Sequence, residues 1–401
     1  MAVHTDTDIA IIGGGPVGAV LALALRDSGL TVTVLEARAK RAEHSVLAES
    51  AEPTAPVQHT HDARPIALSH GSRLVLERLG AWAGLVPTPI TDIHVSQRGG
   101  FGRAAMSARQ VNVPALGYVI DYSTIFRALI DAVRDTNCVY REGASATAIH
   151  RDGDYQQVAY LLDGMLATLN ARVTVVADGG EIDGLAQPQV IDYGQYALTA
   201  RVRTALPHRN IAYERFTHEG PLALLPFGEE MALVWTLTPA RAQLLKTADS
   251  KEFLDALREA FGGRLGSFTA VSQRACYPLT LRYATDATTP GVITIGNAAQ
   301  TLHPVAGQGF NLGLRDAWEL ARILRTVPVQ EMVRNKAVRN FCASRRVDRY
   351  ATFGVTHGLV RLFSNDLSPF DTLRGVGMTL FGSVAPARDF LARRMMFGVR
   401  G

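Results

Sequence analysis

The chain has 401 residues, of which 47% are hydrophobic and 19% are charged, and this composition excludes a disordered chain and an integral membrane protein. Its formal net charge of +4 at pH 7 is too small to predict a nucleic-acid partner. The three cysteines, Cys138, Cys276 and Cys342, are far apart, which argues against a disulfide framework and a zinc site.

The N-terminal segment has the pattern of a strand, a glycine turn and a helix. An apolar run at 9–12 precedes Gly13, Gly15 and Gly18, which have the spacing Gly-x-Gly-x-x-Gly, and a helix is predicted from there to about Ser28. In this fingerprint the first glycine permits a sharp turn, the second lets a diphosphate approach the backbone, and the third lets the helix pack on the sheet. The diphosphate binds the unpaired N–H groups at the positive end of the helix. The pattern therefore predicts a dinucleotide site.

A second apolar strand, 31–35, ends at Glu36, about twenty residues after the glycines, as the same fingerprint requires. A carboxylate at this place accepts hydrogen bonds from ribose hydroxyls and repels a 2′-phosphate. We therefore expect the bound nucleotide to be FAD or NAD rather than NADP.

The next segment, 38–62, is polar and lacks periodicity, which predicts a loop. His59 and His61 lie in it, but no cysteine or acid cluster accompanies them, so we predict no metal site. Ser69 is typical of a helix N-cap. Arg64, just upstream, has two open interpretations, a surface arginine or a guanidinium held over a phosphate or the edge of a flavin.

The middle of the chain alternates strand and helix patterns. The glycine-rich stretch 99–102 predicts a crossing between domains, 123–134 predicts an amphipathic helix, and 157–162 predicts a strand that leads to a hairpin-like turn at Gly164. A buried apolar run then ends in Asp178 and Gly179. Ligands of open α/β sheets bind at such strand ends, although an Asp-Gly pair by itself is more often a plain turn.

Residues from about 189 to 283 predict a series of strands with one helical stretch, 251–261. We expect an antiparallel sheet that forms a second domain and covers a substrate. Apolar or amphipathic residues in these strands are candidates for lining its pocket, with plain core as the alternative. These candidates are Tyr213, Leu224, Pro226 and Trp235.

A second glycine-rich landmark follows, in which a strand at 292–295 leads into a loop and then a helix at 310–324. Glycines at a helix N-terminus expose N–H groups that bind an anion or a carbonyl oxygen, such as the flavin edge that becomes negative on reduction. His303 in this loop is either a catalytic base or a histidine bonded to backbone. The other residues of interest are Gly296, Asn297, Pro304, Gly307 and Gly309.

The remainder, 329–400, predicts mostly helix with aromatic and basic residues. One interpretation is packing on the first domain, and the other is contact with an anionic membrane or a partner.

These motifs, in this order along the chain, resemble those of the single-component FAD-dependent aromatic hydroxylases, the family of para-hydroxybenzoate hydroxylase. The resemblance extends over nearly the whole chain. The segment GNAAQTLHPVAGQGFNLGLRD is most similar to the branch that hydroxylates polyprenylated methoxyphenols in ubiquinone biosynthesis. The resemblance implies an FAD site, with a diphosphate and ribose fingerprint, an arginine near the flavin, an Asp-Gly motif and a loop beside the isoalloxazine. The residues that match it are Gly13, Gly15, Gly18, Glu36, Arg64, Asp178, Gly179, Gly296, Asn297, Pro304, Gly307, Gly309, Phe310 and Asn311.

The resemblance implies a monooxygenase that holds FAD, binds NADPH or NADH transiently, and attacks a hydrophobic phenol through a C4a-hydroperoxyflavin. The cofactor carries this chemistry, and the protein orients the ring and excludes water. No acid–base pair is assigned, and His303 and Pro304 are only candidates beside the flavin.

The expected fold class is α/β. It comprises a Rossmann-like FAD-binding domain with an inserted antiparallel β-sheet substrate domain and a C-terminal helical region. The FAD-binding domain is predicted at 1–75, 105–185 and 285–345, the substrate domain at 76–104 and 186–284, and the helical region at 346–401. We expect a cytoplasmic protein, with association at the inner leaflet or with a quinone-biosynthesis complex through the basic C-terminal region as the open alternative.

Two residues depart from the family pattern. Asn297 stands where a carboxylate is usual, although the ubiquinone branch tolerates asparagine, whose amide can bond a ribityl hydroxyl without charge assistance. Ile182 stands where a serine is usual, so nicotinamide recognition is the less supported part of the resemblance. They motivate an alternative function, a weakly catalytic or non-catalytic flavin-fold subunit of a quinone-biosynthesis complex. A flavin enzyme that reduces or halogenates is a further alternative, although the lysine motif and Trp-rich signature of halogenases are absent.

Overall fold

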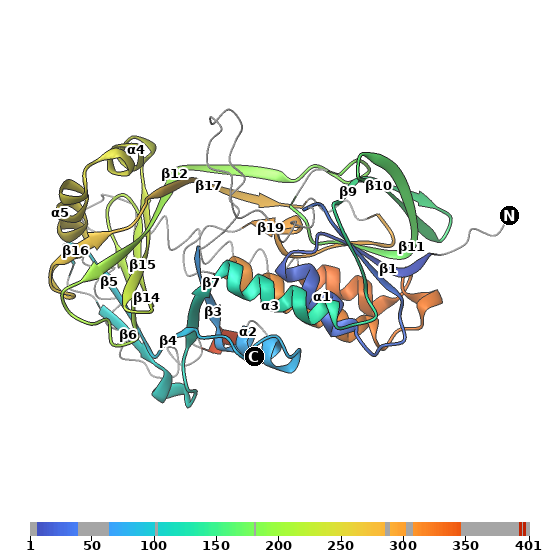
Figure 1. Ribbon diagram of the computed structural model, residues 1–401, viewed down its shortest axis with the longest axis horizontal. Helices are drawn as coiled ribbons and strands as arrows, with labels where there is room; N and C mark the ends of the chain where they lie inside the picture. Colours follow the sequence, from blue (N-terminus) through green and yellow to red (C-terminus); the bar gives the residue numbers. More distant parts are fainter. Residues whose placement is uncertain are drawn as a thin grey trace, which may run out of the picture.

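The computed structural model shows two halves along the long axis of the molecule (Figure 1). Two long strands, β12 (Gln189–Thr204) and β17 (Ala275–Tyr283), run across the space between the halves. The residues that the structure describes are 6–38, 64–100, 103–179, 182–284, 289–301, 308–345, 393–394 and 396–397.

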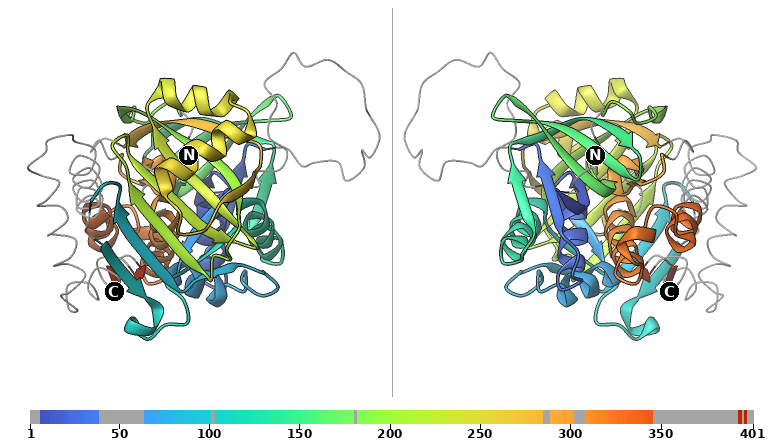
Figure 2. Two further views of the ribbon diagram at one scale, coloured as in Figure 1. Left: turned by 90° about the vertical axis from the view of Figure 1, so that its left-hand side faces the viewer. Right: turned by 90° about the vertical axis from the view of Figure 1, so that its right-hand side faces the viewer.

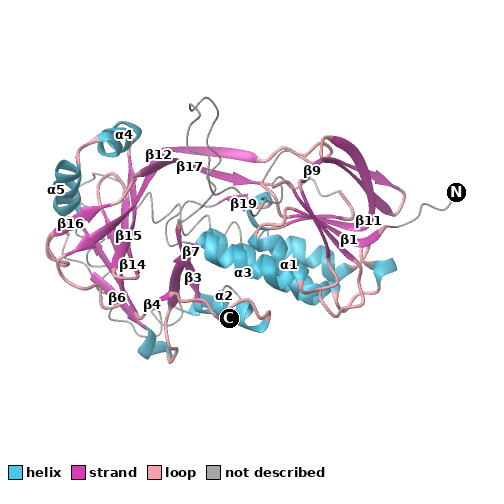
Figure 3. Cartoon of the chain, viewed as in Figure 1, coloured by secondary structure: helices cyan, strands magenta, loops and turns pink. Residues whose placement is uncertain are grey.

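The first sheet has seven strands and a parallel centre formed by β8, β2, β1, β11 and β18, with β10 and β9 added antiparallel beyond β11. Figure 3 shows helices packed beside it. The strands are β1 (Thr7–Ile12), β2 (Val32–Glu36), β8 (Val139–Glu142), β9 (Ala144–Asp152), β10 (Tyr155–Leu162), β11 (Met165–Val176) and β18 (Val292–Thr294). The helices are α1 (Pro16–Leu25), α3 (Tyr122–Arg134) and α6 (Gln308–Leu324).

The helix after the glycine turn, α1, is buried on all sides. Every residue from Gly18 to Leu25 is buried, because α1 packs on the sheet and is flanked by α3 and α6. A helix that is apolar all round is stable only in such a position. The predicted order of strand, glycine turn, helix and strand is confirmed, and α1 ends at Leu25, somewhat before the expected Ser28.

The second sheet has nine strands in the order β19–β17–β12–β15–β14–β13–β5–β6, with β16 beside β12. All neighbours are antiparallel, as expected, except β13 and β5, which are parallel. β5 comes from far upstream in the chain, so no hairpin imposes an antiparallel direction on it. The strands not yet given are β5 (Asp92–Gln97), β6 (Arg103–Ser107), β13 (Ile211–Phe216), β14 (Pro221–Phe227), β15 (Glu230–Leu237), β16 (Phe268–Val271) and β19 (Gln300–Thr301).

Two helices, α4 (Pro239–Thr247) and α5 (Ser250–Phe261), cover the outer face of this sheet, and Figure 2 shows them in yellow. The sequence predicted only the second helix. Thr238 caps α4 by accepting a hydrogen bond from the Arg241 N–H group, and Pro239 occupies its first turn. These are ordinary start signals, so α4 was recognisable from the sequence.

A small third sheet, β3 (Pro65–Ser69), β7 (Gly117–Asp121) and β4 (Thr88–Ile90), stands between the two halves. Its side chains Ile90 and Val119 pack against Ala212 of the second sheet. Ser69 then caps α2 (His70–Arg78) by accepting a hydrogen bond from the Ser72 N–H group at 3.2 Å, as predicted.

The glycine-rich stretch 99–102 does not mark a crossing between domains. The strands on its two sides, β5 and β6, pair with each other, so the chain stays in the second sheet until Ser107. The chain reaches the third sheet only after a short helical turn at Ala108–Val111. The prediction was wrong because glycines are as common between two paired strands as in a linker between domains. The boundaries of the two domains remain a proposal.

Most of the predicted C-terminal helical region, and therefore most of its proposed membrane or partner surface, lies outside the described residues. A short helical piece is described, and in it Met396 is buried against Met106 and Leu116. The ring of Phe397 lies 6.0 Å from that of His70. This piece packs on the fold. Among the described residues, no helix combines the length and apolar character that crossing a membrane requires.

Candidate functional site

The first glycine of the fingerprint is held against the Asp-Gly motif. Gly13 has a φ of +97°, and a Cβ atom on it would lie 2.7 Å from the Asp178 nitrogen and 2.8 Å from the Asp178 Cβ. The adjacent strands β1 and β11 bring them together, since the Ala177 N–H group donates to the Ile12 carbonyl at 2.8 Å. Two motifs far apart in the sequence thus meet at the carboxyl end of one sheet.

The second glycine borders open space. Gly15 precedes α1, no side chain caps this helix, and nothing in the described residues lies within 4 Å of the place where a Cβ atom would be. Gly18, in contrast, packs tightly on the Gly13 carbonyl and on Ile11. Among the described residues, Gly15 is the fingerprint glycine with free space beside it, in front of the helix N-terminus, which fits a diphosphate.

Glu36, which is 8% exposed at the end of β2, holds the glycine turn. Its Oε2 accepts from the Gly14 N–H group at 2.8 Å, and its Oε1 accepts from the Arg38 N–H group at 3.0 Å. Each oxygen can still accept a second hydrogen bond, as a ribose would require.

Tyr140 on β8, which the sequence did not single out, donates from its hydroxyl to the Gly14 carbonyl at 3.0 Å. Burial raises the pKa of Tyr140, so the hydroxyl stays protonated and remains a donor. A contact between residues so far apart has no local sequence signal.

The glycine-containing segment that begins after β18 starts at the same edge of the sheet. β18 pairs with β11 in parallel, so its end, with Gly296 and Asn297, lies beside Asp178 and Gly179. A Cβ atom on Gly179 would lie 3.6 Å from the Asn297 Cβ, and the side chains of Asp178 and Asn297 are both exposed. Gly296 has a φ of +59°, and a Cβ atom there would lie 3.1 Å from Val17 of α1.

Arg64 contacts elements of both halves. Its guanidinium carbon lies 5.6 Å from the centre of the Tyr277 ring on β17, within the range of a cation–π contact. Its carbonyl accepts from the Tyr122 N–H group at 3.0 Å, where α3 begins. A role for Arg64 beside a flavin remains a proposal.

Asn311 is 3% exposed and joins α6 to the third sheet. Its Oδ1 accepts from the Ser69 N–H group and the Ser72 hydroxyl, both at 2.7 Å, and its Nδ2 donates to the Ala67 carbonyl at 2.9 Å. This amide therefore positions the start of α6. The ring of Phe310 lies 6.2 Å from that of Tyr122, and Gly309 is half-buried beside it. His303, Pro304 and Gly307 lie outside the described residues.

The residues expected to line the substrate pocket lie on the outer face of the second sheet. Leu224 and Trp235 are buried in the core beneath α4 and α5, and the ring of Tyr213 lies 5.5 Å from that of Phe261. Pro226 is buried and follows the same alternation along β14. The structure thus places all four on the side away from the first half, as core residues. Alternation predicted which residues share a face, but not which face is covered by helices.

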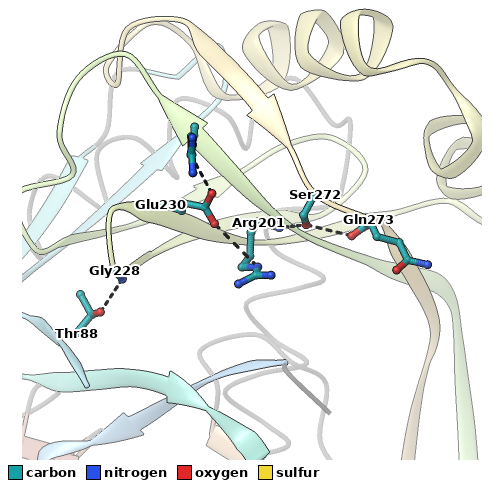
Figure 4. Close-up of polar contacts among 7 residues, drawn as sticks. Thr88, Arg201, Gly228, Glu230, Ser272 and Gln273 are labelled. Atoms are coloured by element: carbon teal, nitrogen blue, oxygen red, sulfur yellow. Dashed lines mark hydrogen bonds and ion pairs between the residues drawn. The ribbon is translucent and has the colours of Figure 1, made fainter. Parts of the chain in front are cut away.

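The inner face of this sheet carries a group of charges near the third sheet. Glu230 accepts from the Arg203 Nε at 3.1 Å, and the Arg201 Nε lies 4.0 Å from its other oxygen (Figure 4). The Gly228 N–H group donates to the Thr88 hydroxyl at 2.8 Å, which ties the turn between β14 and β15 to β4. Burial raises the pKa of Asp121 on β7, and the charge of Arg201 partly opposes this rise.

Ile182, one of the two departures from the family pattern, is buried in the core. It packs with residues of β9, β10 and β11. At this position the chain therefore has a buried isoleucine instead of the serine that is usual in the family.

Comparison with known proteins identifies the family. The FAD binding domain family matches residues 6–332. The chain is 31% identical to ubiquinone hydroxylase UbiL of Rhodospirillum rubrum, over 97% of this chain and 89% of that protein. It is 29% identical to 3-demethoxyubiquinol 3-hydroxylase of Escherichia coli, over 94% of each chain. The structure of p-nitrophenol 4-monooxygenase from Pseudomonas putida has the same fold, with a TM-score of 0.75 at 18% identity over the whole of both chains.

The site and the comparisons agree. The glycine turn, Glu36 and the strand ends that carry Asp178 and Asn297 form one edge of a parallel sheet, where a dinucleotide fits. The family match covers most of the chain, from β1 to the residues after α6. This protein therefore belongs to the FAD binding domain family, with the fold of the FAD-dependent aromatic hydroxylases.

Proposed function

We propose that this protein is an FAD-dependent monooxygenase that hydroxylates a polyprenylated phenol in ubiquinone biosynthesis, with NADPH or NADH and O₂ as co-substrates. The observation that carries the proposal is the meeting of Gly13, Asp178 and Asn297 at one sheet edge, beside the open space at Gly15. The relatives named ubiquinone hydroxylase and 3-demethoxyubiquinol 3-hydroxylase support the substrate class.

In this proposal the diphosphate of FAD binds at Gly15 and the N–H groups of α1, and Glu36 accepts hydrogen bonds from the ribose. Asp178 and Asn297 border the same site from the neighbouring strand ends. When bound, FAD supplies the electron transfer from NAD(P)H to O₂. The protein contributes the orientation of the phenol ring and the exclusion of water.

The substrate side of the proposed site is the inner face of the second sheet. Leu225 and Phe227 lie there, with Ala212, and they pack near Ile90 and Val119 of the third sheet. These apolar side chains suit a substrate with a hydrophobic tail, and Arg201 and Arg203 are charged residues of β12 on this face.

Adjacent leucines of β14 test this assignment. Leu224→Ala removes a side chain from the outer core, and we expect it to lower the free energy of unfolding by about 2 to 5 kcal/mol and to leave KM for a prenylated phenol unchanged. Leu225→Ala removes a side chain from the inner face, and we expect it to raise that KM by about tenfold with a smaller loss of stability. Urea unfolding and steady-state kinetics of both variants measure this. Equal KM values for the two variants would contradict the assignment.

The function is tested with the purified full-length protein. We expect a visible flavin spectrum, and aerobic oxidation of NADPH or NADH that a prenylated methoxyphenol stimulates, with a hydroxylated product found by mass spectrometry. A protein that takes up no added FAD would instead favour the non-catalytic subunit. Bound FAD without phenol-stimulated oxidation would favour a flavin enzyme of another activity.

A further inference from the structure

Glu214 of β13 points toward the inner face of the second sheet. Its neighbours Tyr213 and Arg215 point outward, since the Tyr213 ring contacts Phe261 and the Arg215 Nε donates to the Ala260 carbonyl at 3.1 Å, both on α5. Side chains alternate along a strand, so Glu214 shares the inner face with Ala212 and Phe216. Ala212 packs near the third sheet, and Phe216 packs on Val95.

The residues beside Glu214 in the same row of the sheet are apolar. Across the ladder it lies beside Val95 on β5 and Ala223 on β14, and Val234 on β15 follows in the same row. Among the described residues, no hydrogen-bond donor or cation contacts it, and the side chain is half-buried. Burial raises the pKa of Glu214 to about 7.

The charged groups that the described part of the chain places on this side have other partners, and Arg203 is bonded to Glu230. On β12, Arg201 interacts with Glu230 and acts on Asp121 of β7, and Arg64 stacks on Tyr277. None of these charges contributes to the pKa of Glu214, whose rise has burial as its cause. A half-buried carboxylate beside apolar residues, with no partner among the described residues, is a candidate for a functional role.

We propose that Glu214 accepts the proton of the substrate's phenol hydroxyl, an inference that rests on the proposed function. The O–H bond of the phenol breaks, an O–H bond forms on the carboxylate, and the electron pair stays on the phenolate oxygen, with no change of oxidation state. The phenolate ring is richer in electrons than the neutral phenol and is therefore easier to hydroxylate. A proton acceptor with a pKa near the working pH is the most effective general base.

The inference is tested by comparing the FAD-loaded wild-type enzyme with Glu214→Gln, which keeps the shape and removes the proton acceptor. We expect the hydroxylation rate near neutral pH to fall by about 100-fold, while the flavin spectrum and the reduction of flavin by NAD(P)H are retained and the melting temperature does not fall. The loss should shrink as the pH approaches about 10, where the phenol ionises without help. The matched control is Glu229→Gln, at an exposed glutamate in the turn between β14 and β15, which should behave as wild type.

Two results would overturn the inference: a Glu214→Gln enzyme with the wild-type rate and pH profile, or a loss of the same size at every pH, which a purely structural role would produce. A binding measurement separates this inference from the proposed function. With a prenylated phenol bound near neutral pH, the ultraviolet difference spectrum should show phenolate in wild type and neutral phenol in Glu214→Gln. If wild type forms phenolate but no hydroxylated product, the proposed function fails and the role of Glu214 as proton acceptor stands.

Discussion

Replacing Gly13 by alanine is expected to destabilise the apoprotein by about 3 kcal/mol and to abolish FAD binding. The φ of +97° is strained for any residue with a side chain, and the new Cβ atom would lie 2.7 Å from the Asp178 nitrogen. The chain must therefore shift at the place where β1 and β11 end. Urea unfolding of the apoprotein and the flavin absorbance of the purified variant measure the two effects.

The matched control for Gly13 is Gly15→Ala. Gly15 has a φ of −60°, which alanine adopts without strain, and no atom of the described residues lies within 4 Å of its Cβ position. We expect the stability of the apoprotein to change by less than about 0.5 kcal/mol. The affinity for FAD should fall by at least about tenfold, because the methyl group occupies space proposed for the diphosphate. Wild-type affinity of Gly15→Ala in a fluorescence titration would show that the diphosphate lies elsewhere.

Replacing Arg345 by methionine is expected to lower the free energy of unfolding by about 3 to 5 kcal/mol. The Arg345 Nη1 lies 3.2 Å from the Asp316 Oδ1, and the two side chains are 10% and 3% exposed. Its Nη2 lies 3.0 Å from the Glu319 Oε2. Without the guanidinium, Asp316 on α6 is a buried charge without its counter-ion. Arg334→Met, which breaks an exposed pair with Asp154, should cost less than about 1 kcal/mol.

The pH dependence of this pair has a defined sign. Burial raises the pKa of Asp316 to about 6, against the opposing charge of Arg345, whereas an unfolded aspartate has a pKa of about 3.9. Between these values the folded state binds more protons, so this group lowers stability as the pH rises through the window. Arg345→Met raises the pKa of Asp316 in the folded state further. As the pH is lowered from about 7 to about 5, the free energy of unfolding of the variant should therefore increase more than that of wild type. A variant with the wild-type pH dependence in urea unfolding would contradict this account.

Local chemistry in the sequence was sufficient for the dinucleotide unit. Gly13, Gly15 and Gly18 between two apolar strands, with Glu36 at the end of the second, specify a strand, a helix and a strand through turn sterics and buried periodicity alone. The cap at Ser69 and the helix α5, which ends at Phe261, follow from equally local signals. Thr238, the N-cap of α4, followed by Pro239, is a local start signal of the same kind.

Contacts between distant segments decided the rest. Three contacts join segments whose local sequences do not predict that they meet. They are the hydrogen bond from Tyr140 to the Gly14 carbonyl, the hydrogen bonds of the Asn311 amide to β3 and α2, and the parallel pairing of β13 with β5. The alternation of Tyr213 and Glu214 was visible in the sequence, but a period of two residues assigns side chains to two faces without saying what covers each. Only the packing of α5 on one face turned Tyr213 into a core residue and left Glu214 on the face proposed to meet the substrate.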